Sequence, residues 1–350
     1  MVGSTNVTSA ERPRLRSAAA ASGAFLLLLT IALVVVAVLS LMLGPAHLSL
    51  SELFLGLTGQ SETAAIILRE IRLPRLILSL SIGGMLGLAG AAVQGLSRNP
   101  LAEPAVLGTP QAAALGAVLM IYSGLADAFS LALPLAAIVG ALLAMLATLL
   151  VVRRVGGVIS LLLIGLMIGS LAAAAISLIL SLSSNPYAVT EIVFWLMGSF
   201  TDRSMWHVVL SLPFIIVGAA ALFWCGPAYK ALTLGEETAT SLGFDIWRVS
   251  LITSAGIALG VGAGTAVSGA IGFVGLLAPH MVRPFVRSDA QAVLLPSALA
   301  GAILTTAADV LVKLIPATSE IRVGALMAVI GAPCFLYLVI ARPYRLDDRA

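Results

Sequence analysis

Few residues in this chain have side chains suited to catalysis, and their spacing fits no catalytic site. The three histidines, His47, His207 and His280, lie in separate segments without a clustered carboxylate, so they predict no zinc site. The two lysines, Lys230 and Lys313, do not follow the glycines of a phosphate-binding loop, which excludes ATP hydrolysis by that route. Serines are plentiful, but no nucleophile elbow accompanies them. We predict no catalytic residue, no metal site and no covalently bound cofactor.

A line of serines is the most regular polar pattern in the chain. Ser170, Ser177, Ser181 and Ser184 follow one another at intervals of seven, four and three residues, which places them on one face of a helix. Such a face either lines a wet path or satisfies its hydroxyls on carbonyls of its own or a neighbouring helix. The residues alone leave both interpretations open.

Charged residues within the apolar part of the chain form two small groups. Arg69, Arg72 and Arg75 lie close together, and Asp309 precedes Lys313 by four residues. In a helix that spacing allows an ion pair. A cationic partner near a helix end favours structural neutralisation of Asp309 over a role in proton transfer.

The composition indicates which elements must position these residues. Of the 350 residues, 60% are apolar and 10% are charged, whereas a soluble domain carries about 25% charged residues. Apolar runs of roughly 18–24 residues can each cross about 30 Å of hydrocarbon as a helix. The unbroken run Phe25–Leu43 excludes the alternating pattern of a β-barrel. We predict an all-α polytopic membrane protein whose basic residues orient loops and bind no nucleic acid.

Charges, prolines and turn residues divide the sequence into ten candidate spans. The eighth is short and contains Gly and Pro, which predicts a broken helix buried among the others. Most Lys and Arg residues fall on the side of the termini, which predicts that both termini are cytoplasmic. The predicted divisions are a tail at 1–21, a transmembrane domain at 22–340 and a tail at 341–350. The spans are Ser22–Leu43, Leu76–Leu96, Ala105–Tyr122, Leu131–Val152, Ile159–Leu182, Met205–Cys225, Val249–Val267, Ile271–Phe285, Ala292–Leu314 and Val323–Ile340.

The longest inner loop, residues 226–247, contains the signals of a short helix. Glu236 and Glu237 stand at its start, where the helix dipole favours negative charge, and Gly243 stands at its end. The segment is either an ordinary amphipathic connector or a docking helix for a cytosolic partner.

Glycines recur at four-residue intervals in several spans, and Gly256, Gly260 and Gly264 form two consecutive steps. Small residues at this spacing let helix backbones approach closely, so the pattern predicts tight packing of a bundle.

Several stretches resemble the FecCD-type permeases of ATP-binding-cassette importers, which take up ferric siderophores, haem and vitamin B12. These stretches are Ile71–Arg75, Gln94–Pro104, and Gly269–His280 with Arg283 following. Gly235–Gly243 and Val323–Pro333 are similar to the same family. The resemblance covers roughly residues 66–337.

The resemblance implies a type II importer permease fold of about ten transmembrane helices. It implies partners: a second permease subunit, expected to be an identical copy, two cytosolic ATPase subunits that use ATP, and an extracytoplasmic binding protein. The chain itself is then a transport subunit and no enzyme. The loop 226–247 resembles the coupling segment that docks the ATPase, and the predicted coupling residues are Leu234, Gly235, Glu236, Glu237, Ser241, Leu242 and Gly243.

The resemblance also gives roles to the other polar patterns. The loop Arg153–Ser160 resembles the cytoplasmic gate, although it lacks the hydroxyl pair found in the vitamin B12 permease. In family members, basic residues equivalent to Arg72, Arg75 and Lys313 receive acidic residues of the binding protein. The alternative is that the arginines reach lipid headgroups while Lys313 pairs with Asp309. The fifth and tenth spans resemble pathway-lining helices, with predicted pathway residues Ser170, Ser177, Ser181, Ser184, Gly324, Met327 and Gly331.

We therefore predict the permease subunit of an ATP-driven importer in the cytoplasmic (inner) membrane of a prokaryote. The expected cargo is an iron chelate, with a ferric siderophore first and haem or cobalamin next, carried by alternating access. The competing class is an ion-coupled secondary transporter, for which broken helices with charges at the membrane midplane would be the signature. Charges here collect at helix ends, which favours the importer.

Overall fold

The computed structural model describes residues 11–44, 49–128, 131–286, 289–315 and 321–341. Within these ranges the chain consists of helices and connecting loops and contains no strand. The prediction of an all-α protein is confirmed.

Ten helices in the described ranges match the ten predicted spans in order. The eighth of them is short, as its glycines and proline predict. By length and composition, seven helical segments of the described chain can cross a membrane. The ten helices are α1 (Glu11–Met42), α4 (Leu73–Ser97), α5 (Thr109–Tyr122), α7 (Ala132–Val155), α8 (Val158–Leu182), α10 (Met205–Trp224), α13 (Ile246–Ser268), α14 (Val274–Val282), α15 (Leu294–Leu314) and α16 (Val323–Ala341).

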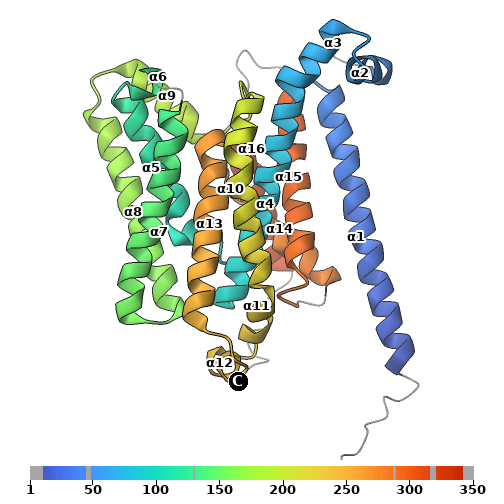
Figure 1. The fold of residues 1–350 in the computed structure, drawn as a ribbon, viewed down its shortest axis with the longest axis vertical. Coiled ribbons are helices and arrows are strands. Elements are labelled where there is room, and N and C mark those ends of the chain that lie inside the picture. The colour runs from blue at the N-terminus through green and yellow to red at the C-terminus, as the bar shows by residue number, and fades with distance from the viewer. Residues whose placement is uncertain (1–10, 45–48, 129–130, 287–288, 316–320, 342–350) are drawn as a thin grey trace, which may run out of the picture.

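Short helices cover both ends of the bundle. They are α2 (Leu50–Leu57), α3 (Glu62–Ile66), α6 (Leu125–Ala128), α9 (Pro186–Leu196), α11 (Gly226–Leu232) and α12 (Glu236–Ser241). Figure 1 shows α2, α3, α6 and α9 at one end, called here the α9 end, and α11 and α12 at the other, the α12 end.

Two predicted boundaries differ from the structure at the N-terminal side of helices. Helix α1 begins at Glu11, so part of the predicted tail 1–21 is helical. Helices α3 and α4 join through a π-helical turn at Ile67–Arg72 into one segment, Glu62–Ser97, that is longer than the predicted span. Of the predicted C-terminal tail 341–350, residues 342–350 lie outside the described residues.

Small residues set the helix spacing in the core. A Cβ atom built on Gly87 of α4 would lie 2.1 Å from the carbonyl oxygen of Ser297 in α15. One built on Gly218 of α10 would lie 2.4 Å from the carbonyl oxygen of Gly256 in α13. Only glycine permits backbones this close, so the predicted small-residue packing is confirmed at these crossings.

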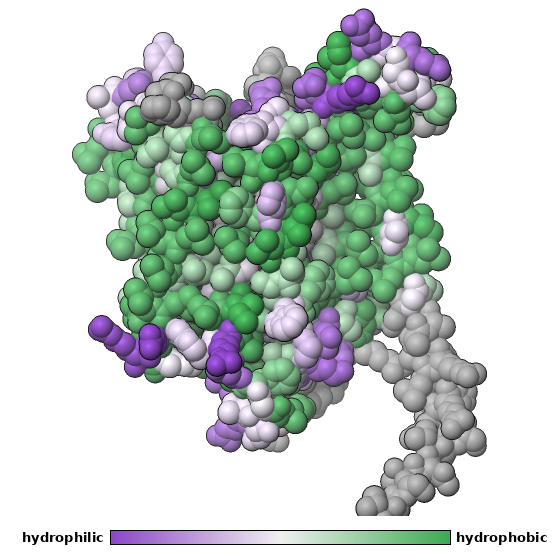
Figure 2. All heavy atoms as spheres, viewed as in Figure 1, coloured by the Kyte–Doolittle hydropathy of each residue, from purple (hydrophilic) through white to green (hydrophobic). Residues whose placement is uncertain are grey.

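The outer surface is apolar around the middle of the bundle and polar at both ends (Figure 2). Leu27 of α1, Leu143 of α7 and Leu171 of α8 are each more than half exposed. Apolar side chains in this position are stable in lipid and costly in water, which agrees with a protein that spans a membrane.

Candidate functional site

A buried ion cluster joins α4 to α15. The guanidinium of Arg75 donates from Nε to both carboxylate oxygens of Asp309, at 2.9 and 3.0 Å. Lys313, one turn along α15, lies with its Nζ 3.0 Å from Oδ2 of the same carboxylate. Asp309 is fully buried. One carboxylate therefore neutralises two cations away from water, and the predicted pair of Asp309 with Lys313 is confirmed.

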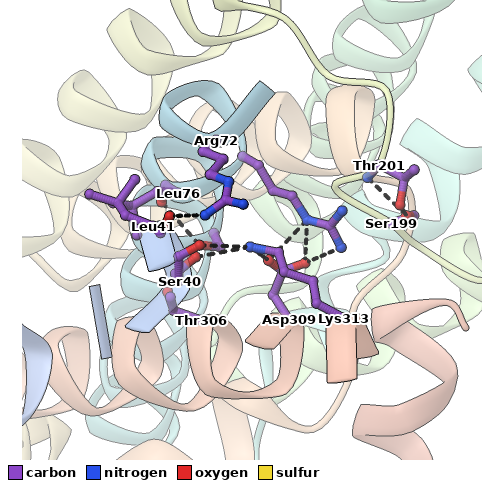
Figure 3. Close-up of polar contacts among 11 residues, drawn as sticks. Ser40, Leu41, Arg72, Leu76, Ser199, Thr201, Thr306, Asp309 and Lys313 are labelled. Carbon is purple, nitrogen blue, oxygen red and sulfur yellow. Dashed lines mark hydrogen bonds and ion pairs between the residues drawn. The ribbon is translucent and has the colours of Figure 1, made fainter. Parts of the chain in front are cut away.

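The same cluster holds the end of α1. Lys313 Nζ donates to Ser40, at 3.1 Å to its hydroxyl and 3.3 Å to its carbonyl oxygen. Arg72 donates to the carbonyl oxygen of Leu41 (Figure 3). These carbonyls belong to the last turn of α1. Carbonyl groups in the last turn of a helix have no backbone N–H partner within the helix. The cations therefore satisfy the helix end and fasten α1 to the bundle.

An exposed docking surface built from Arg72, Arg75 and Lys313 does not fit this structure. The exposed fractions are 5% for Arg72 and 9% for Arg75, and the Lys313 side chain is 5% exposed. Their charges are engaged by Asp309 and by α1 because a cation in the apolar region requires a partner. In this chain the three residues are buried structural contacts, and their part in docking a binding protein stays a prediction.

Gln94 connects the stretches that carry the family resemblance. Its Nε2 donates to the carbonyl oxygens of Ala102, at 3.2 Å, and Gly275, at 3.4 Å. Its Oε1 accepts a 2.7 Å hydrogen bond from Arg283. Gly90, one turn earlier, lies so close to the Gly275 carbonyl that a Cβ would be 1.9 Å from it. These motif residues thus fix the broken eighth helix against α4, a contact that sequence reasoning missed.

Helix α12 forms in the predicted coupling loop. It begins at Glu236, ends at Ser241 and is followed by Gly243 with a φ of +91°. Ala239, within the helix, is fully buried, while Leu234 and Leu242, just before and after the helix, are 66% and 60% exposed. The predicted short capped helix is confirmed. Two exposed leucines at a polar end of the bundle form an apolar contact surface.

A cavity of about 1020 Å³ lies beside α12. One wall is the α7–α8 turn, with Arg153, Gly156 and Gly157, and the other includes Glu236 and Thr240. The loop that resembles a gate and the segment that resembles a coupling element therefore face the same space. The Glu236 carboxylate Oε1 also lies 3.9 Å from the guanidinium Nη2 of Arg98, at the end of α4.

The serine stripe is open on the surface of this chain. Ser170, Ser177 and Ser181 of α8 are exposed, and the last two donate to backbone carbonyls one turn earlier, at 3.1 and 2.9 Å. Among the described residues no other helix covers this face. Ser184 is the exception to the predicted pattern because α8 ends at Leu182, so Ser184 lies in the following loop and not on the helical face.

Two of the three residues predicted to line a pathway on α16, Met327 and Gly331, are buried inside this subunit, and Gly324 is half-buried. Met327 is 4% exposed and Gly331 is buried, with a Cβ on Gly331 meeting Phe273 at 2.7 Å. A Cβ built on Gly324 would lie 2.2 Å from the carbonyl oxygen of Met197. These three small or flexible residues allow close packing inside the subunit. The exposed face of α16 instead carries apolar residues such as Val329, which is 72% exposed.

A multi-pass helical bundle with an apolar belt, an open polar helix face and a capped helix at one end defines a polytopic membrane protein. Comparison with known proteins gives the particular family. The model of the FecCD transport family matches residues 32–341, so the chain belongs to this family of transport permeases.

Relatives and a solved structure agree with that assignment. The cobalamin import system permease protein BtuC of Halobacterium salinarum is 37% identical over 290 residues, covering 82% of this chain and 77% of the relative. The ABC transporter permease protein YvrB of Bacillus subtilis is 37% identical over 286 residues, 80% of each chain. An inward-facing structure described as a metal-chelate type ABC transporter has a TM-score of 0.82 and 30% identity, over 90% of this chain and 98% of its own.

Proposed function

We propose that this chain is the permease subunit of an ATP-driven importer for a metal chelate. Two cytosolic ATPase subunits, a second permease subunit and an extracytoplasmic binding protein complete the transporter. It would lie in the cytoplasmic membrane of a prokaryote with both termini inside. The observation that carries the proposal is α12, a short helix that presents exposed leucines at a polar end of a family permease.

The coupling role of α12 follows from its surroundings. Leu234 and Leu242 offer apolar anchors, and Gly235, Glu236, Glu237, Ser241 and Gly243 supply the remaining predicted contact surface. An ATPase that moves α12 would act directly on the cavity shared with Arg153 and Gly157. Movement of the helix can therefore open or close the predicted gate within one subunit.

The transport pathway is proposed to run between two permease subunits. The described part of this chain leaves Ser170, Ser177 and Ser181 uncovered on α8, beside exposed Leu171. A second copy facing this surface would enclose the serines in a weakly polar path. An identical copy is the simplest partner because closed two-fold symmetry is the commonest assembly.

The cargo class is a metal chelate that is not chemically altered. Relatives named for cobalamin and vitamin B12 favour a corrinoid. The sequence motifs shared with siderophore and haem permeases keep a ferric siderophore, our first expectation from the sequence, and haem as further candidates. The serines of α8 supply mild polarity and no metal-selective ligand set, so recognition rests on the chelator.

The coupling proposal is tested with two variants of α12 in the assembled transporter. Ala239→Pro should abolish cargo uptake, since proline costs about 3 kcal/mol inside a helix. Glu236→Arg should lower uptake because it places a cation beside Arg98. Glu62→Arg, at the α9 end, is the matched control and should transport normally. Assembly with the ATPase is measured by co-purification. Uptake at the wild-type rate in both α12 variants would refute the coupling role.

A further inference from the structure

A second cavity opens at the α9 end of the bundle. Its volume is about 740 Å³. Its walls are formed by α6, α7, α9, α10, α13, the loop between α9 and α10, and the residue before α16. Aromatic residues and cations share this space. The side chains on which the argument rests are Tyr187, Phe194, Trp195, Arg203 and Arg322.

Two polar groups of this cavity are buried without a hydrogen-bond partner. They are Nε of Arg203 and the indole Nε1 of Trp195. Both are donors, and neither atom is exposed to water in the described chain. A buried donor without an acceptor is unfavourable, and the cost is greater when the group is charged. These two donors therefore lack an acceptor within reach, which an anionic oxygen would supply.

Arg322 strengthens the preference for an anion. Its guanidinium carbon lies 5.2 Å from the centroid of the Phe194 ring, which supports it against one wall. Within the described ranges neither Arg203 nor Arg322 forms an ion pair with a carboxylate. Glu191 and Asp202 also line the cavity; both are exposed to solvent, which weakens their attraction for the arginines without abolishing it.

The two arginines also influence each other. Burial lowers the pKa of Arg203, the neighbouring Asp202 carboxylate opposes this effect, and the charge of Arg322 lowers the pKa further. An anion held between the guanidiniums would remove this repulsion. Planar guanidiniums bind carboxylate and phosphate groups through paired hydrogen bonds, which makes arginine well suited to such a role.

We propose that this cavity is a binding subsite for an anionic oxygen group, a carboxylate or a phosphodiester, attached to a planar ring of the cargo. Arg203 and Arg322 would bind the anion, Trp195 would donate a further hydrogen bond, and Tyr187 and Phe194 would contact the ring. The inference rests on the proposed import function and names the part of the chelate that the permease recognises. No residue of the ion cluster at Asp309 takes part.

The test uses the full-length permease alone in lipid nanodiscs, so that its result does not depend on ATP-driven transport. The probe is trimesate, a benzene ring that carries three carboxylates, and calorimetry measures its affinity. Trimesamide, the neutral triamide of the same shape, is the matched ligand. We expect trimesate to bind at least about ten-fold more tightly than trimesamide, because charge-assisted bonds are the stronger ones.

Variants of the cavity complete the design. Arg203→Gln and Arg322→Gln should each weaken trimesate binding about ten-fold, whereas Arg203→Lys should retain part of the affinity. Arg248→Gln, at the exposed cytosolic pair with Asp245, should bind as the wild type does. Equal affinity for trimesate and trimesamide, or unchanged trimesate binding in both glutamine variants with wild-type melting temperatures, would overturn the subsite.

A further arm separates a cargo group from an acidic side chain of the binding protein. Association of the binding protein is measured with the wild type and with Arg203→Gln. The proposal expects unchanged association. Weakened association together with unchanged trimesate binding would assign the cavity to protein docking and overturn the proposal. Failure of the importer itself would show separately, as absent uptake with intact trimesate binding.

Discussion

Replacing Asp309 with Asn tests the role of the buried ion cluster. The substitution keeps the shape of the side chain and removes the single negative charge that faces Arg75 and Lys313, at 2.9 and 3.0 Å. Breaking a buried pair by removing one partner costs about 3–5 kcal/mol, because the remaining charge stays buried without compensation. Asp309 is fully buried and the Lys313 side chain only 5% exposed, so little solvent screening reduces this value.

The assay is reversible unfolding of the purified protein in mixed micelles of mild detergent and dodecyl sulfate. Asp309→Asn should lower the free energy of unfolding by about 3–5 kcal/mol. Asp245→Asn removes an exposed partner of Arg248 and should change it by about 0–1 kcal/mol. Adding Lys313→Met to Asp309→Asn removes one of the unpaired cations and should restore part of the loss.

The reasoning is refuted by a loss below about 1 kcal/mol for Asp309→Asn, since that is the range of an exposed pair. It is also refuted if Lys313→Met makes the double variant less stable still. In either case the cluster would be hydrated, and the fastening of α1 would need another explanation.

Three further predictions concern packing, pH and the pathway. Gly90→Val should greatly reduce the yield of folded protein, because even a Cβ would lie 1.9 Å from the Gly275 carbonyl oxygen. Thermal melting of the purified variant measures the loss of stability. Burial raises the pKa of Asp289, but hydrogen bonds from Lys230 and backbone amides outweigh it and leave the pKa below its usual value. Its stabilising contribution is therefore present above about pH 4 and lost as pH falls through the folded pKa, so melting temperatures of Asp289→Asn should decline less than those of the wild type between pH 5 and pH 3. Ser177→Trp should block uptake at an unchanged melting temperature, whereas a parallel loss of stability would identify a packing face.

Many features that depend on local sequence can be predicted correctly. Apolar length and punctuation located the ten helices, and the acids before Gly243 located α12. The pair of Asp309 with Lys313 follows from helical periodicity alone. Each of these features involves residues within one helix or one loop.

Features that depend on tertiary packing were not predictable in the same way. Arg75 meets Asp309 across 234 positions of sequence, and no local pattern indicates that contact. The inward position of Met327 depends on which side of α16 meets the bundle, and uniformly apolar helices do not encode it.

Helix α9 was missed because it is short, although Asn185 followed by proline is a helix-start signal, and Asn185 does cap it.

The most direct test of the account is cargo uptake by vesicles that contain the chain with its ATPase and binding protein. Labelled cobalamin and a labelled ferric siderophore are each supplied, with ATP or a non-hydrolysable analogue inside. The account predicts uptake of one chelate that requires ATP hydrolysis and persists when an ionophore collapses the proton and sodium gradients. Uptake that continues without the ATPase and stops with the ionophore would contradict it and establish an ion-coupled transporter.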